Sequence, residues 1–312
     1  MSLVRRLTLR QLEVFCEAAR LLNFARVAEH LHLTQPAVSM LIRQIEASLD
    51  LALFERSGKK MRLTEAGETL KHHALRILGE LRDADQALNA YKGLEGGSIT
   101  VGLVSTAQYF APKLLAQFAR QYPGIDVQFQ VGNRETLIRL LRDNQTDLVI
   151  MGRAPAILET VSEPLAENPH VLVAHPDHPA LGRTGLTLRD LQQETFLLRE
   201  AGSGSRSVME EFFEAHDFTP ARTSTMGSNE TIKQAVMAGL GISLLSLHTL
   251  ALELRGHDLA LLEIDGTPLR RTWHIVHMRA KQLSPAGQQF RRFLIEQTEG
   301  FLRNHLVLNE DD

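Results

Sequence analysis

The spacing of apolar residues between positions 24 and 46 predicts two helices joined by a tight turn. In the second helix the apolar residues recur at spacings of four, three and four, the period of one buried helix face. They are Val38, Ile42, Ile45 and Leu49. Thr34 can cap this helix with its hydroxyl, and Pro36 is tolerated in its first turn. The stretch therefore has the pattern of a helix-turn-helix with a candidate recognition helix.

The polar face of the second helix offers Gln35, Ser39 and Arg43, which can hydrogen-bond to base edges or phosphates. Together with Thr34 and Pro36, these residues form the predicted DNA-reading surface. Met40 and Leu41 lie beside it, and they either contact thymine methyl groups or only widen the buried stripe. For this stretch alone, an amphipathic helical hairpin in an ordinary core is the alternative interpretation.

A basic turn follows the predicted helices. Residues 53–56 and 61–63 look like two short strands around the turn SGKK, which predicts a winged helix-turn-helix. Contacts of the wing with phosphates would contribute affinity and salt dependence rather than sequence specificity. The expected backbone contacts are Asn23, Arg56, Lys59, Lys60 and Arg62. A solvated basic turn is the alternative.

The charge distribution supports this placement. The net charge is −3, but residues 1–64 carry ten Lys or Arg against six Asp or Glu, so the remainder carries a net charge of −7. A polyanion is therefore expected at the N-terminal part. The single cysteine, Cys16, excludes a disulfide framework within the chain. No signal peptide or 18-residue apolar run is recognisable, which predicts a cytoplasmic protein.

A long helix is predicted over residues 65–91, and it would span roughly 40 Å. Its apolar residues alternate spacings of four and three, which makes a heptad seam. They are Leu70, Ala74, Ile77, Leu81, Ala84, Leu88 and Tyr91. The helix either packs on its own domain or pairs with a second copy, and the charged residues off the seam favour the pair. A dimer would present two recognition helices to a two-fold-related DNA site.

Beyond a linker at residues 93–97, continuous apolar strands alternate with helices, which indicates parallel sheets covered on both faces. We expect two Rossmann-like α/β lobes of periplasmic-binding-protein type, with hinges near 162–167 and 266–271 and a closing helix over 285–303. The expected domains are an all-α winged helix-turn-helix (1–64), a linker helix (65–93), an effector-binding domain (94–303) and a tail (304–312). Within the effector-binding domain, the first lobe is expected to comprise residues 94–164 and 269–303, and the second lobe residues 165–268.

Polar residues gather where the predicted strands of the body end, and ligands of open α/β sheets bind beyond such strand ends. Hydroxyls, arginines and the free N–H groups of helix N-termini there can donate to oxyanions. The expected effector-binding residues are Ser105, Thr106, Asn133, Arg134, Arg153, Arg199, Gly202, Ser203, Gly204, Ser205, Arg206, Ser228, Asn229, Glu230 and Thr231. We expect no cofactor, but an anionic effector such as a phosphorylated or polycarboxylate metabolite. Alternatively, the glycine-serine run is only a flexible turn, Ser228 is only a helix cap, and each arginine pairs with a surface carboxylate.

An enzymatic function is not indicated. The glycine-rich segment lacks the P-loop spacing, and neither a G-x-S-x-G elbow nor HExxH occurs. His274 and His277 lie on opposite faces of a probable strand, and His72 and His73 are adjacent on a helix. Both pairs are poorly placed to share a metal ion, so we expect no metal site.

The winged helix-turn-helix, the seam helix and the two-lobed body together resemble the LysR-type transcriptional regulators over essentially the whole chain. The N-terminal pattern is LRQLEVFCEAARLLNFARVAEHLHLTQPAVSMLIRQIEASLDLALFERSGKKMRLTEAG. The body is similar to the subgroup that regulates Calvin-cycle (RuBisCO) operons in autotrophic bacteria. The segments behind that likeness are GLVSTAQYFAPKLLA, GNRETLIRLLRDN, DLVIMGR, FLLREAGSGSR and GSNETIKQAVMAGLGISLLSLHTLALEL. Ala201 departs from a common proline, Ser205 from a common threonine, and Asn23 from a frequent serine.

The resemblance implies double-stranded promoter DNA as partner, a dimer through residues 65–91 or a tetramer, and RNA polymerase as a further candidate partner. It implies effectors such as phosphoenolpyruvate, sugar bisphosphates, ATP or NADPH, and no membrane. A LysR-type regulator of another metabolic operon with a carboxylate effector is the alternative within the family. A solute-binding protein or a small-molecule enzyme on the two-lobed body is the alternative outside it.

Overall fold

The computed structural model describes residues 7–58, 60–91 and 96–306, and the chain divides into two units. One unit comprises Met1–Asn89 with the short segment Asp143–Gln145. The other comprises Ala90–Arg142 and Thr146–Asp312. Each unit has its own buried apolar core, so the fold of each is described by itself.

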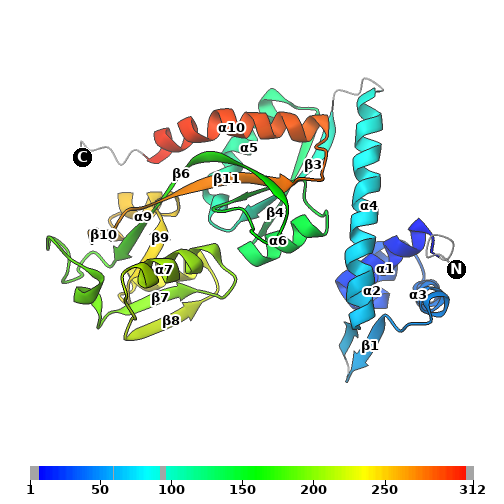
Figure 1. The fold of residues 1–312 in the computed structure, drawn as a ribbon, viewed down its shortest axis with the longest axis horizontal. Coiled ribbons are helices and arrows are strands. Elements are labelled where there is room, and N and C mark those ends of the chain that lie inside the picture. The colour runs from blue at the N-terminus through cyan, green and yellow to red at the C-terminus, as the bar shows by residue number, and fades with distance from the viewer. Residues whose placement is uncertain (1–6, 59, 92–95, 307–312) are drawn as a thin grey trace. The chain divides into compact units, whose positions relative to one another are not determined.

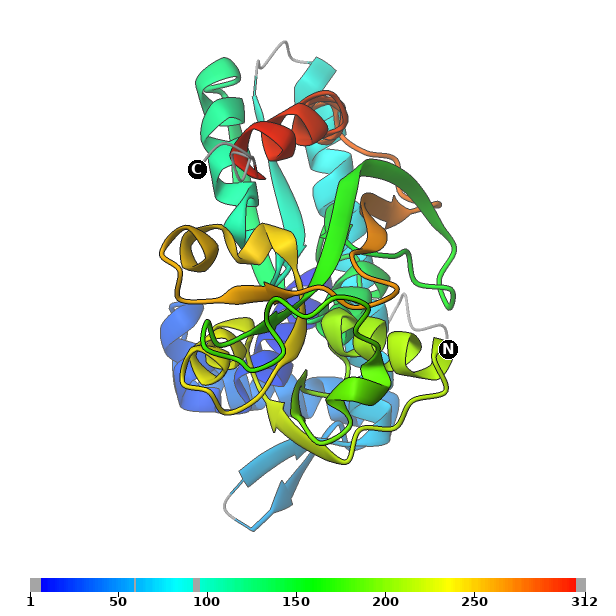
Figure 2. The ribbon, with the colours of Figure 1, turned by 90° about the vertical axis from the view of Figure 1, so that its left-hand side faces the viewer.

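The first unit is a winged helix-turn-helix followed by a long helix (Figure 1). Its elements are α1 (Leu9–Leu21), α2 (Phe24–His30), α3 (Gln35–Leu49), β1 (Phe54–Ser57), β2 (Lys60–Leu63) and α4 (Glu65–Tyr91). Val38, Ile42 and Ile45 of α3 are buried, and Leu49 packs against the same core, as the apolar spacing predicts. Strands β1 and β2 form an antiparallel ribbon that projects from the helices of this unit (Figure 2).

Helix α4 packs on its own domain over only the first part of its seam. Leu70 and Ala74 are buried in the core of the first unit. Further along the same seam, Ile77, Leu81 and Leu88 are exposed by 42%, 44% and 61%. The side chain of Tyr91 lies outside the described residues. The first part of the seam therefore packs on its own domain, while the second part presents apolar side chains to solvent.

The second unit consists of two α/β lobes. Its helices are α5 (Ala111–Gln121), α6 (Arg134–Arg142), α7 (Gly204–Ala215), α8 (Asn229–Met237), α9 (Ala251–Arg255), α10 (Pro285–Leu306) and the 3₁₀ turns η2 (Ala107–Tyr109), η3 (Leu188–Leu191) and η4 (Leu247–Thr249). Its strands are β3 (Gly97–Val104), β4 (Ile125–Gly132), β5 (Leu148–Met151), β6 (Thr160–Ala174), β7 (Thr195–Arg199), β8 (Arg222–Met226), β9 (Ser243–Ser246), β10 (Ala260–Leu262) and β11 (Leu269–Met278).

Two long strands, β6 and β11, run antiparallel to each other between the lobes (Figure 1). Strand β11 also pairs with β5 of the first lobe, while β6 continues to pair with β9 and β10 of the second lobe. The expectation of purely parallel sheets is therefore wrong, since only the β3–β4, β3–β5 and β7–β8 pairs are parallel.

The predicted hinge segments fall where the chain crosses between the lobes, since residues 162–167 lie inside β6 and residues 266–271 run into β11. Pro164 lies inside β6, although proline donates no ladder hydrogen bond and favours strand ends or bulges. The register indeed shifts opposite Pro164, between Trp273 and His274. The crossover between the lobes is thus a pair of antiparallel strands.

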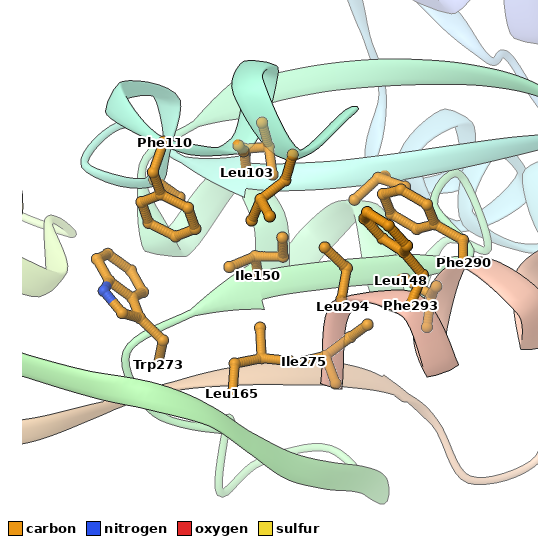
Figure 3. Close-up of a cluster of buried hydrophobic side chains, with 14 of the residues drawn as sticks. Leu103, Phe110, Leu148, Ile150, Leu165, Trp273, Ile275, Phe290, Phe293 and Leu294 are labelled. Carbon is orange, nitrogen blue, oxygen red and sulfur yellow. The ribbon is translucent and has the colours of Figure 1, made fainter. Parts of the chain in front are cut away.

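The first lobe has an apolar core on each face of its sheet, and the larger of the two is shown in Figure 3. Leu103 and Ile150 come from its central strands, Trp273 and Ile275 from β11, and Phe290 from α10. The C-terminal helix therefore returns to the first lobe. The second lobe has separate cores on the two faces of its strands, built around Phe196 and Val236. These cores hold rigid strand ends against one another, and the polar residues at those ends form the candidate site.

Candidate functional site

The recognition helix α3 is capped as the sequence indicates. The Thr34 hydroxyl accepts a hydrogen bond from the backbone N–H of Ala37 at 3.3 Å. Before α2, the Asn23 side chain accepts from the backbone N–H groups of Ala25 and Arg26, at 3.0 and 3.2 Å. These caps fix where the two helices begin and therefore which residues of α3 face outward.

The outward face of α3 forms a shallow groove lined by Gln35, Pro36, Ser39, Met40, Arg43, Gln44 and Ala47. The Gln35 side-chain amide donates to the Ser39 hydroxyl at 3.0 Å, so the two polar side chains act as one surface. Met40 is 55% exposed on this face, whereas Leu41 packs against the core of the unit. Leu41 therefore widens the buried stripe, while Met40 remains exposed beside Gln35 and Ser39.

The predicted wing cations lie on two faces of the β1–β2 ribbon. Arg56 pairs in register with Met61 on the face that carries Phe54, while Lys60 and Arg62 lie on the opposite face. All three side chains belong to exposed residues. Lys59 lies outside the described residues. The ribbon therefore carries exposed positive charge on both of its faces.

A cavity of about 310 Å³ lies where the strands of the two lobes end. Eight of the residues expected from the sequence line it: Ser105, Thr106, Asn133, Arg134, Arg153, Ser203, Gly204 and Ser205. They come from the ends of β3, β4 and β5 and from the start of α7. The structure thus brings hydroxyls, an amide and two guanidinium groups from both lobes to one cavity.

The paired strands β6 and β11 contribute cavity residues that the sequence did not single out. They are Asn168, His170, Arg270, Arg271, Thr272, Trp273 and His274, and α7 adds Ser207, Val208 and Glu211. The adjacent pair Arg270-Arg271 was a signal in the sequence, but it fell in a segment interpreted as a hinge. Its importance depends on the pairing of β6 with β11.

Two expected arginines lie outside the cavity wall. Arg199 is only 4% exposed, and its guanidinium pairs with Glu200 at 2.8 Å and donates to the Ser105 hydroxyl at 3.3 Å. Arg206 pairs with Glu210 at 2.7 Å and donates to the Arg199 carbonyl at 3.1 Å. Both cations are committed to protein partners, so they position the strand end rather than face a ligand.

The segment Ser228, Asn229, Glu230 and Thr231 also lies outside the cavity wall, at the start of α8. Ser228 caps α8 by accepting from the Thr231 N–H at 3.0 Å. Burial raises the pKa of Glu230, but hydrogen bonds from Lys233 and from Tyr109 of the first lobe outweigh it and lower that pKa overall. Asn229 donates to the Tyr109 hydroxyl at 3.4 Å. These residues tie the two lobes together.

Gly202 makes a further contact between the lobes. The backbone N–H of Glu135, on α6 of the first lobe, donates to the Gly202 carbonyl at 3.3 Å. Gly202 has φ +81°, and a Cβ there would lie 2.6 Å from a carboxylate oxygen of Glu135. A side chain at this position is therefore both strained and obstructed, and the glycine permits the close approach.

The charge balance of the cavity favours anions. Arg134, Arg153, Arg270 and Arg271 line it, and Glu211 is the one carboxylate among its described lining residues. Arg134 donates to the carbonyls of Arg153 and Ala154, and its pKa is lowered by burial and by the charge of Arg153. Arginine donors in such a net positive, partly desolvated cavity can form charge-assisted hydrogen bonds to an oxyanion.

Two buried histidines support the cavity wall without adding charge. Burial lowers the pKa of His170 and of His248 to about 4, so both rings are neutral at pH 7. The neutral His248 ring accepts the indole N–H of Trp273 at 3.1 Å. Trp273 is the only tryptophan of the chain and lines the cavity, so its fluorescence can report on ligand binding there.

Both parts of the chain match known families. Residues 9–68 match the family described as bacterial regulatory helix-turn-helix protein, lysR family, and residues 92–299 match the LysR substrate binding domain. In the part of the chain that the structure describes, no helix combines the length and apolar character needed to cross a membrane.

Similar proteins are known over nearly the full length. The chain is 58% identical over 301 residues to the HTH-type transcriptional regulator CfxR of Cupriavidus necator, covering 96% of this chain and 95% of that protein. It is 45% identical to the RuBisCO operon transcriptional regulator of Allochromatium vinosum, covering 93% and 96%. A structure of the Synechocystis CcmR regulatory domain in complex with 2-PG superposes with a TM-score of 0.61 at 36% identity, covering 65% of this chain and 97% of that chain.

Proposed function

Because the chain belongs to the LysR family of bacterial transcriptional regulators, we propose that it controls Calvin-cycle CO2-fixation genes in response to a phosphorylated metabolite bound between its lobes. The names of its relatives support the target, since one of them is a RuBisCO operon regulator at 45% identity. Such a regulator would act on promoter DNA in the cytoplasm, with RNA polymerase as a further partner.

The groove of α3 supplies the DNA contacts in this proposal. Gln35, Ser39 and Arg43 would reach base edges, with Met40 against a thymine methyl group. The exposed wing residues Arg56, Lys60 and Arg62 would contact phosphates and set the salt dependence of binding.

Replacing Arg43 by alanine is expected to weaken operator binding by roughly 5- to 150-fold, because a guanidinium that forks onto a base contributes about 1–3 kcal/mol. The loss of affinity is measured by gel-shift titration with DNA fragments from upstream of neighbouring operons. Arg10→Ala removes an exposed arginine of α1 that pairs with Glu13, and it should leave the affinity unchanged. Equal loss of operator and effector binding in Arg43→Ala would contradict the separation of the two sites.

A second copy is required to present two recognition helices. The exposed seam residues Ile77, Leu81 and Leu88 of α4 supply an apolar stripe of the kind that pairs in helical dimers. We propose a dimer through this stripe and a tetramer of two such dimers. Effector binding would change the relation of the two lobes, and thereby the spacing or bend of the bound DNA.

The observation that carries the effector proposal is the cavity itself: four arginines and several hydroxyls against one carboxylate, with contributions from both lobes. The CcmR domain, which binds 2-PG, has the same fold at 36% identity. A ligand that contacts both lobes binds one arrangement better than another, which is the condition for a shift between states.

The effector is tested by titration of the purified full-length protein, following Trp273 fluorescence and thermal unfolding. We expect 2-phosphoglycolate or phosphoenolpyruvate to change the fluorescence and to raise the unfolding temperature. A response only to unphosphorylated carboxylates would favour a regulator of another metabolic operon. Stabilisation by a neutral or aromatic compound alone would exclude the anionic effector.

A further inference from the structure

Glu211, on α7 of the second lobe, occupies an unusual position in the arginine-rich cavity. One of its carboxylate oxygens lies 2.6 Å from a guanidinium nitrogen of Arg271, on the crossing strand β11. The other lies 3.1 Å from a guanidinium nitrogen of Arg153, which follows β5 of the first lobe. A single carboxylate therefore holds two arginines from two different elements and bridges the cleft.

Arg153 and Arg271 differ from Arg134 in the acceptors that their guanidinium groups contact. The donors of Arg134 go to backbone carbonyls of residues 153 and 154, which a ligand does not displace. Arg153 and Arg271, which are 66% and 35% exposed, instead pair with the Glu211 side chain, which is itself 35% exposed and can turn away to water. Their guanidinium donors can therefore change partner.

A phosphoryl or carboxylate group of a ligand needs the same donors that Glu211 takes. Guanidinium groups bind carboxylates and phosphates through the same forked geometry, so the two anions exclude each other at one guanidinium edge. Two anions in one small cavity also repel each other. An anionic ligand that takes the guanidinium nitrogens of Arg153 and Arg271 that face Glu211 therefore displaces its carboxylate.

We propose that Glu211 is an internal competitor of the anionic effector for Arg153 and Arg271, and that this competition sets the effector concentration at which the regulator responds. The inference rests on the proposed function, since it requires an anionic effector in this cavity. The competition also couples effector binding to a rearrangement of the lobes. Displacing Glu211 breaks its ion pair with Arg153, which joins α7 to the first lobe.

The test compares full-length wild type with Glu211→Gln, using 2-phosphoglycolate and phosphoenolpyruvate as probes and Trp273 fluorescence as readout. Glutamine keeps the size of the side chain but gives up its charge, so we expect the dissociation constant of the tighter probe to fall at least tenfold. The rise in unfolding temperature caused by that probe should also be larger in the variant. Glu210→Gln, whose partner Arg206 lies outside the cavity wall, should match wild type.

The outcomes separate this inference from the function on which it rests. If wild type binds a probe and Glu211→Gln binds it equally or more weakly, Glu211 positions the arginines for the ligand and the competition is overturned. If neither protein binds either probe, the anionic effector fails, and the competition fails with it. Glu211→Ala serves as a second variant, and it should share the gain in affinity if charge removal is the cause.

Discussion

Leu81→Glu combined with Leu88→Glu is expected to convert the protein to a monomer and to weaken operator binding by more than a hundredfold. Both leucines lie on the exposed part of the α4 seam, at 44% and 61% exposure, and neither belongs to the buried core of the unit. Burying two carboxylates in an apolar helix pair is strongly unfavourable. A monomer offers only one recognition helix. It therefore loses the gain in apparent affinity that comes from linking two binding modules, which reaches about 10²–10⁴-fold. Sedimentation velocity and gel shifts measure the two effects.

Arg76→Glu provides the matched control for this pair of substitutions. Arg76 is exposed on α4 but lies off the seam, so the new carboxylate should leave the dimer intact. A double variant that remains dimeric would place the dimer contact elsewhere. A monomer that still binds the operator with wild-type affinity would mean that one module is sufficient for recognition.

The DNA-binding unit was predictable because its determinants are local. The period of Val38, Ile42 and Ile45 specifies one buried helix face, and that face determines which side chains remain outside. The end of the dimer seam was not predictable in this way. Leu70 and Ile77 occupy equivalent heptad positions, yet one is buried in its own domain and the other is exposed. Only the packing of the wing and first helices against α4 distinguishes them.

The cleft was predictable where strands end in polar residues and unpredictable where long-range pairing decides. Ser105, Asn133 and Arg153 follow strands directly, and they line the cavity as expected. Arg271 lies in a segment that the sequence predicted as a hinge, and His170 was not predicted as a site residue. Both reach the cavity because β6 and β11 pair as antiparallel strands. Arg199 shows the opposite error: it ends a strand, but Glu200 beside it takes its charge.

Acidification from pH 7 to pH 5 is expected to reduce the stability of the effector-binding body through two buried histidines. Burial holds the pKa of His170 and His248 at about 4, below the ordinary value of 6.5. Between these values the unfolded chain binds more protons than the folded one. The stability present above pH 6.5 is therefore lost as the pH falls toward 4, by about 2 kcal/mol per histidine at pH 5. Urea unfolding followed by Trp273 fluorescence measures it.

His248→Gln isolates the contribution of one ring. Glutamine can still accept the Trp273 indole N–H through its side-chain oxygen, but it cannot take up a proton. We expect the stability lost between pH 7 and pH 5 to fall by about 2 kcal/mol relative to wild type. His257→Gln changes an exposed histidine and should leave that loss unaltered. A His248→Gln protein that loses as much stability as wild type would show that the ring is hydrated or protonated in the folded state. The rings of Phe110 and Trp273 pack near the His248 ring and make its surroundings apolar. These surroundings favour the neutral ring, and with it the expected difference of about 2 kcal/mol.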